Sequence, residues 1–209
     1  MGLPALNLPE KPVQFSVEEY LQLEKEAEFK SEFTNGFVWA IAGASPSHNA
    51  VNYNFTRLTS PSIYQRGCQG YSSDQRVQTK TRSGYLYPDT VVACNPTFNT
   101  QPNPPSLTNP VFIMEVTSAS TGGRDHHDKF MLYRQIESLR QYLMLSSQAV
   151  HAELSTLDEQ NRWVLTETRA PAAMLSLSSM GCQVLLGEVY VGVTLDASEE
   201  LDEEAEKER

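Results

Sequence analysis

Residues 109–145 read NPVFIMEVTSASTGGRDHHDKFMLYRQIESLRQYLML, and their pattern indicates the architecture of the chain. The run 111–116 is almost entirely apolar, which is the pattern of a central strand covered on both faces. A polar, glycine-containing turn over 118–124 follows it, and a helix is expected over 125–137. A second β-rich segment, 141–146, then completes a strand–helix–strand unit. This order predicts an α/β (α+β) fold in which helices flank a mixed β-sheet.

Local signals place the elements on either side of this unit. A capping box beginning at Ser16 predicts a first helix over 16–29, and the Asn-Gly pair at 35–36 predicts a turn after it. A second helix is expected over 46–66, bent or broken at Pro61. The remaining predictions are an irregular proline-rich connection over 95–110 and strands over 75–81, 84–93, 149–156 and 161–168.

Length and charge indicate one domain with a distinct tail. The 209 residues contain 40% hydrophobic residues, enough for a packed core. Residues 196–209 hold eight acids and two bases, a net of −6, so the formal charge of −10 leaves only −4 for residues 1–195. We therefore expect an arm over 1–14, a single domain over 15–195 and an acidic tail over 196–209.

Several function classes are disfavoured by the composition. No apolar run approaches the roughly 20 residues that span a bilayer, so no membrane partner is expected. The first residues do not form a signal peptide, which makes the cytoplasm the expected compartment. Cys68, Cys94 and Cys182 are odd in number and lack a CxxC spacing, so we expect packing roles for them rather than a disulfide framework or a zinc site.

Two carboxylates stand where the pattern predicts buried strand. Glu115 lies within the apolar run VFIMEV, and Asp89 directly precedes VVAC. Either Glu115 reaches solvent as its strand ends and Asp89 belongs to a Pro-Asp turn, or the two acids meet. Buried carboxylates are costly unless they are paired or bind a cation, and a pair of them suits a hard divalent ion.

A lysine on the following helix is the third candidate. Asp125, Lys129 and Tyr133 fall on one helical face at intervals of four residues. Most helical lysines are simply solvated. The functional alternative is that Lys129 reaches the acids, orients an attacking water and stabilises negative charge that develops during hydrolysis.

The same segments resemble a known family. YLYPDTVVAC and the stretch 109–145, together with SVEEYLQLE, SEFTNGFVWAIAGASPSHN, RGCQGYSSDQRV and LLGEVYVGV in that order, are similar to the Uma-type putative restriction endonucleases of the PD-(D/E)xK superfamily. The resemblance covers about residues 15–193 and implies that the domain over 15–195 is restriction-endonuclease-like. It implies a magnesium or manganese site at Asp89 and Glu115, with Glu32, in the first-helix acidic position of the family, shaping the site or binding a second metal or water. It also implies a homodimer.

One departure from the superfamily pattern concerns the lysine. The superfamily places it two residues after the acid, and here that position is Thr117. Lys129 matches the lysine that the Uma-type family uses instead, so the assignment requires its side chain to reach the acids.

Candidate substrate-binding residues are His48, Arg76, Lys80 and Tyr133. His48 matches the family, although a hydrogen bond at the start of a helix explains it equally well. Five bases and one acid lie between residues 57 and 82, and this excess of +4 either lines a phosphate-facing cleft or is a solvated face.

The sequence thus predicts a magnesium-dependent endonuclease that cuts DNA. Two alternatives stay open: a binding or regulatory protein that keeps the fold without catalysis, and a metal-dependent hydrolase of a smaller phosphoester.

Overall fold

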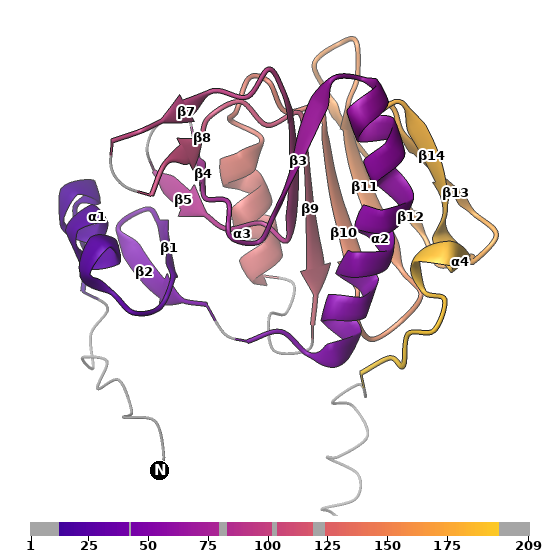
Figure 1. The fold of residues 1–209 in the computed structure, drawn as a ribbon, viewed down its shortest axis with the longest axis horizontal. Coiled ribbons are helices and arrows are strands. Elements are labelled where there is room, and N and C mark those ends of the chain that lie inside the picture. Colours follow the sequence, from indigo (N-terminus) through magenta and orange to yellow (C-terminus); the bar gives the residue numbers. More distant parts are fainter. Residues whose placement is uncertain (1–12, 42, 80–82, 102–103, 119–123, 197–209) are drawn as a thin grey trace, which may run out of the picture.

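The computed structural model describes residues 13–41, 43–79, 83–101, 104–118 and 124–196 (Figure 1). The elements, in chain order, are α1 (Val17–Glu26), β1 (Ser31–Thr34), β2 (Phe37–Ala40), α2 (Pro46–Gln65), β3 (Cys68–Ser72), β4 (Val77–Gln78), β5 (Gly84–Leu86), β6 (Thr90–Cys94), β7 (Phe98–Asn99), β8 (Ser106–Leu107), β9 (Phe112–Thr117), α3 (Arg124–Tyr133), β10 (Gln141–Ser146), β11 (Ala152–Leu157), β12 (Trp163–Thr168), β13 (Met174–Leu177), β14 (Cys182–Leu185) and α4 (Leu186–Val189).

A six-stranded mixed sheet forms the centre of the fold. Its strand order is β12-β11-β10-β9-β6-β3, in which β9 and β10 run parallel and the other pairs run antiparallel. The parallel pair is joined by α3, as a parallel connection requires. The predicted central strand is confirmed, since five of the six residues of β9 are buried.

Helices cover both faces of this sheet (Figure 1). Met114 and Val116 of β9 join the core beneath α2, which also includes the β13–β14 hairpin and α4. Ile113 points to the opposite face and joins a core with α3 and with strands of the smaller sheet. Because side chains alternate along a strand, Glu115 also belongs to the α3 face. The expected flanked mixed sheet is therefore confirmed.

A second sheet, of order β2-β1-β5-β4-β8-β7, carries the N-terminal part of the chain. Helix α1 begins at the predicted capping box, in which the Ser16 hydroxyl accepts from Glu19 N and the Glu19 carboxylate accepts from Ser16 N. Tyr20 of α1 stacks on Phe33 of β1 with ring centroids 5.0 Å apart. The Asn35–Gly36 turn closes the β1–β2 hairpin, and both residues have positive φ.

Some element boundaries differ from the predictions. Helix α2 runs unbroken through Pro61, because proline removes only one hydrogen bond from a helix that is held by its buried face. The connection over 95–110 contains the short strands β7 and β8. Strand β3 and the elements from β13 onward were not predicted. Most of the expected arm and tail, over 1–12 and 197–209, lies outside the described residues.

The expectation for the cysteines was wrong for two of the three. Cys68 and Cys94 form a disulfide between the antiparallel strands β3 and β6, where the register places them directly opposite each other. The sequence does not predict this pairing, because the two cysteines are 26 residues apart and only the pairing of β3 with β6 brings them together. Cys182 is free.

The disulfide leads to a prediction about stability. The double substitution Cys68→Ala/Cys94→Ala is expected to lower the free energy of unfolding by about 3 kcal/mol, because it releases a closed loop in the unfolded chain. Urea denaturation of the oxidised protein measures this, with Cys182→Ala as the matched control. Equal urea midpoints for the wild type and the double variant would show that this bridge contributes nothing.

Within the described ranges, none of the helices combines the length and the apolar character that crossing a bilayer requires.

Candidate functional site

Glu115 is a buried carboxylate on the α3 face of the central sheet. Only 4% of the residue is exposed, so it does not reach solvent at a strand end. The Tyr133 hydroxyl of α3 donates to Glu115 Oε1 over 3.1 Å. Tyr133 is itself fully buried, which gives it a role in holding this carboxylate rather than a surface that faces a substrate.

Asp89 lies beside Glu115 because of the register of β6 and β9. Thr90 pairs with Met114 in an antiparallel ladder, so one further step brings Asp89 level with Glu115. Asp89 Oδ2 accepts from Val116 N over 2.7 Å, which anchors the carboxylate to β9. Its other oxygen, Oδ1, lies 2.8 Å from His48 Nε2 at the start of α2.

Lys129 extends from α3 into this acidic site. Its Nζ lies 2.9 Å from Glu32 Oε2 and 3.9 Å from Glu115 Oε1, and its side chain is only 12% exposed. A solvated lysine would not be held in this way. The assignment of Lys129 required its side chain to reach the acids, and the structure shows that it does.

Glu32 comes from a different element than expected. It lies on β1 and not in the first-helix position, because the chain has already entered the smaller sheet at Ser31. Its Oε1 accepts from Tyr87 N over 2.9 Å and from Lys129 Nζ over 3.1 Å. Both Glu32 oxygens are thus engaged by hydrogen-bond donors of the protein.

The electrostatics of the site follow from burial. Removal from water raises the pKa of Glu115 to about 8; the Lys129 ammonium opposes this shift, while the negative charges of Asp89 and Glu32 add to it. Burial and then the charge of Glu115 raise the pKa of Tyr133 well above its ordinary value, which keeps its hydroxyl a hydrogen-bond donor. If all three carboxylates of the described site were ionised, they would carry more negative charge than Lys129 balances, which is why Glu115 keeps its proton to a higher pH.

This donor set fits a divalent cation. Asp89 and Glu115 offer carboxylate oxygens, the ligands that Mg²⁺ and Mn²⁺ prefer. Their mutual repulsion in a buried position is what a bound cation would relieve. No cluster of three or more His, Cys, Asp or Glu side chains suited to a metal occurs in the described part of the chain. The fit is thus to an ion that keeps several waters, as Mg²⁺ does.

The other predicted residues differ in whether they lie at this site. His48 joins the site through Asp89. Arg76 does not face a cleft: it is 1% exposed, donates to Ser106 Oγ over 2.9 Å and lies over the Tyr85 ring, so the structure contradicts a substrate-facing position for it. Lys80 lies outside the described residues, as do the side chain of Asp125 and the turn over 119–123. Arg76 therefore does not line a basic cleft.

Sequence reasoning missed the polar side chains that support Asp89. Asn52 Oδ1 accepts from the Thr90 hydroxyl over 2.8 Å, and Asn52 Nδ2 lies 3.4 Å from the Asp89 carbonyl. The signal was available, because residues 48, 52, 56 and 60 of α2 are polar at intervals of one helical turn.

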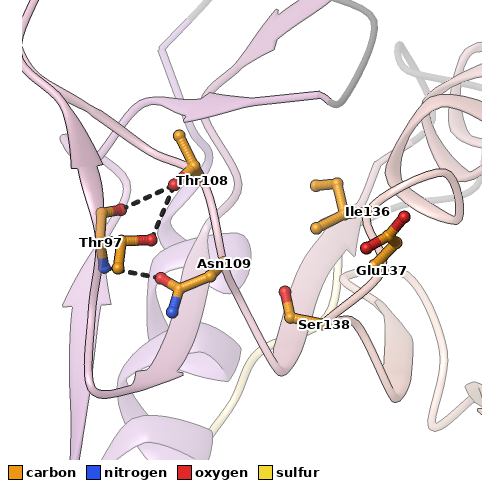
Figure 2. Close-up of a pocket in the computed structure, with 6 residues that line it drawn as sticks. All are labelled: Thr97, Thr108, Asn109, Ile136, Glu137 and Ser138. Atoms are coloured by element: carbon orange, nitrogen blue, oxygen red, sulfur yellow. Dashed lines mark hydrogen bonds between the residues drawn. The ribbon is translucent and has the colours of Figure 1, made fainter.

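Two pockets differ in their relation to this site. One, of about 350 Å³, runs from Asp89 and Thr90 along α2 and β3. The other, of about 340 Å³, is shown in Figure 2, where Thr97, Thr108 and Asn109 face Ile136, Glu137 and Ser138. The second pocket lies at the opposite end of β9, since Ser138 bonds the Pro110 carbonyl just before that strand. It contains none of the candidate site residues.

The chain is similar to several known proteins. A family model described as "Uma2: Putative restriction endonuclease" matches residues 17–185. The Synechocystis sp. (strain ATCC 27184 / PCC 6803 / Kazusa) protein sll1609, named as uncharacterized, is 36% identical over 162 residues, which cover 78% of this chain and 92% of that protein. A second uncharacterized protein of that organism, slr1290, is 29% identical over 180 residues, or 86% and 93% of the two chains.

A solved structure supports the fold. The crystal structure of a putative nuclease belonging to DUF820 from Anabaena variabilis superposes with a TM-score of 0.68 at 12% identity. The match covers 86% of this chain and 99% of that one. At this identity the similarity establishes a shared fold.

Proposed function

Since the chain belongs to the Uma2 family of putative restriction endonucleases, we propose that it is a divalent-metal-dependent endonuclease that hydrolyses phosphodiester bonds in DNA. The observation that carries this proposal is the position of Lys129, buried 2.9 Å from Glu32 and 3.9 Å from Glu115. A lysine held between carboxylates supplies the charge stabilisation that cleavage of a phosphodiester requires.

Asp89 and Glu115 are the proposed metal ligands, and Mg²⁺ is the proposed ion, with Mn²⁺ as the alternative. When bound, the ion polarises the phosphate and lowers the pKa of a coordinated water. Tyr133 holds Glu115 Oε1, the backbone N–H of Val116 holds Asp89 Oδ2, and Asp89 Oδ1 lies 2.8 Å from His48 Nε2. Glu115 Oε2 and the second lone pairs of the held oxygens would therefore face the ion. His48 fixes the orientation of Asp89 from the opposite side.

Lys129 and Glu32 are proposed to act on the water and the phosphate. The Lys129 ammonium orients the attacking water and stabilises negative charge on the phosphate oxygens. Glu32 positions that ammonium, because its Oε2 lies 2.9 Å and its Oε1 3.1 Å from Lys129 Nζ. Glu32 is itself held in place, since Oε1 also accepts from Tyr87 N. We therefore assign Glu32 to positioning Lys129 rather than to binding a second metal ion or water.

The substrate and assembly are also part of the proposal. DNA is favoured by the family, although the mild acidity of residues 1–195 and the buried Arg76 mean that bulk positive charge does not attract it. A homodimer, in which each copy cuts one strand, is proposed by the resemblance alone. Light scattering of the purified protein measures that assembly directly.

Cleavage of supercoiled plasmid tests the activity. Nicking is expected with Mg²⁺ or Mn²⁺ and not with EDTA, and a parallel preparation of Asp89→Asn controls for a contaminating nuclease. Equal nicking by both preparations would contradict the proposal. If neither cuts, a series of substrates from a nitrophenyl phosphodiester to an oligonucleotide separates a small-phosphoester hydrolase from a binding protein, because only the former releases product.

A further inference from the structure

The pocket next to Asp89 forms a groove along α2, and this α2 groove has a consistent chemistry. Its lining residues come from α2, β3 and the start of β6: Asn52, Thr56, Ser60, Ile63, Tyr64, Gly70, Tyr71, Ser72, Asp89 and Thr90. The α2 residues 52, 56, 60 and 64 follow each other at one-turn intervals, a length of about 18 Å. One end of the groove is therefore the candidate metal ligand Asp89, and the other end is Tyr64.

The α2 groove is neutral apart from that one end. Asp89 is the only charged side chain among its described lining residues, and the others offer hydroxyl, amide and aromatic groups. A phosphate would find no cation in it to replace its hydration. A flat, uncharged group with polar edges fits this lining, and in a nucleic acid that group is a base.

An aromatic ring and an open floor provide room for such a group. Tyr64 is 66% exposed and lines the groove with its ring. The ring of Tyr71 points to the other face of β3, where it packs edge-on against Phe98 with centroids 6.0 Å apart. At Gly70, an added Cβ would meet only Ile63 Cδ1, at 3.6 Å, so the absent side chain leaves the groove open. Bases stack on aromatic rings in proteins that bind single strands.

We propose that the α2 groove binds an unpaired base of the DNA strand whose neighbouring phosphate lies at Asp89. The base must be unpaired, because a base inside a duplex is stacked on both faces and paired along its edge. A cavity of about 350 Å³ accepts one such group beside the cleaved bond. This inference rests on the proposed function and adds to it a preference for single-stranded or locally opened DNA.

Filling the floor of the groove tests this without disturbing the acids. Gly70→Val adds a side chain that a strand tolerates, and Gln69→Val, on the opposite face of β3, is the matched control. Fluorescence anisotropy in EDTA measures binding of a labelled single strand and of the same sequence as a duplex. We expect Gly70→Val to bind the single strand about tenfold more weakly, the order of one stacked base, with the duplex and the control unchanged.

The salt dependence adds a second measurement. Because the groove is neutral, the slope of log affinity against log salt should be the same for Gly70→Val and the wild type. Thr56→Val, which keeps the side-chain volume, should weaken single-strand binding in the same sense. Single-strand affinities equal within twofold in the wild type and Gly70→Val, or an equal loss for duplex, would overturn the inference.

Failure of this inference is distinguishable from failure of the proposed function. Binding in EDTA requires neither metal nor cleavage, whereas the plasmid assay requires both. If the wild type nicks plasmid with metal, but the wild type and Gly70→Val bind single strands equally well, the nuclease proposal stands and this one is lost.

Discussion

Nicking of supercoiled plasmid is expected to fall by at least about a hundredfold in Lys129→Ala, the lower end of what general acid–base and charge stabilisation contribute. The reason is geometric: Lys129 is the cation that lies 2.9 Å from Glu32 and 3.9 Å from Glu115 in the described site. Lys25→Ala, which removes an exposed lysine from α1, is the matched control and should nick like the wild type.

Loss of folding must be separated from loss of chemistry in that experiment. Removing Lys129 leaves Glu32 and Glu115 without their cation, and breaking a buried pair costs roughly 3–5 kcal/mol. The double substitution Lys129→Met/Glu32→Gln removes the charge and its partner together, so it should unfold near the wild-type temperature and still fail to nick. A double variant that folds and cuts within tenfold of the wild type would exclude a catalytic role for Lys129.

Local signals in the sequence were sufficient for the core of the fold. The apolar run around Glu115 predicted a covered central strand, and the capping box at Ser16 predicted the start of α1, because both patterns act over a few residues. The strand–helix–strand order then predicted a mixed sheet flanked by helices, in which the structure pairs β9 and β10 in parallel.

The contacts that the sequence did not predict depend on the register between strands that are far apart in the chain. Cys68 meets Cys94, and Asp89 meets Glu115, only because β6 pairs with β3 on one side and with β9 on the other. Glu32 enters the site from the smaller sheet, where Tyr87 N holds it. Arg76 was expected at a surface, but it is buried against a serine hydroxyl and the Tyr85 ring. Because these partners are uncharged, no acidic residue in the sequence indicates that the arginine is buried.

Together these contacts explain why the site needs both sheets. Asp89 and Glu115 belong to adjoining positions of the central sheet, whereas Glu32 belongs to the smaller sheet, and Lys129 reaches across from α3 to Glu32 and Glu115. The core that α3 shares with both sheets therefore fixes the distance between the proposed metal ligands and the lysine. Changes in that core should alter the proposed activity without touching a charged residue.

Glu115→Gln is expected to stabilise the metal-free protein at high pH. In the wild type the folded-state pKa of Glu115 is about 8, because of burial, above the ordinary value of 4.5. Between these values the unfolded chain releases the proton while the folded chain retains it, so stability falls as pH rises. The contribution of the Glu115 proton to the stability of the folded protein is fully present below pH 4.5 and is lost as pH rises through about 8. Glutamine has the same shape and cannot ionise.

Urea denaturation in EDTA at a series of pH values measures the difference between the two proteins. Their free energies of unfolding should be nearly equal near pH 4.5. By pH 9 the variant should be more stable than the wild type by roughly 2 kcal/mol, the order of the cost of a buried, incompletely paired charge. Glu159→Gln, the same change at an exposed position, controls for general charge effects. Adding Mg²⁺ at pH 9 should stabilise the wild type and not the variant, because only the wild type keeps both carboxylate ligands. Parallel pH profiles for wild type and Glu115→Gln would mean that Lys129 neutralises Glu115 fully, and the excess negative charge that favours a cation would then be absent.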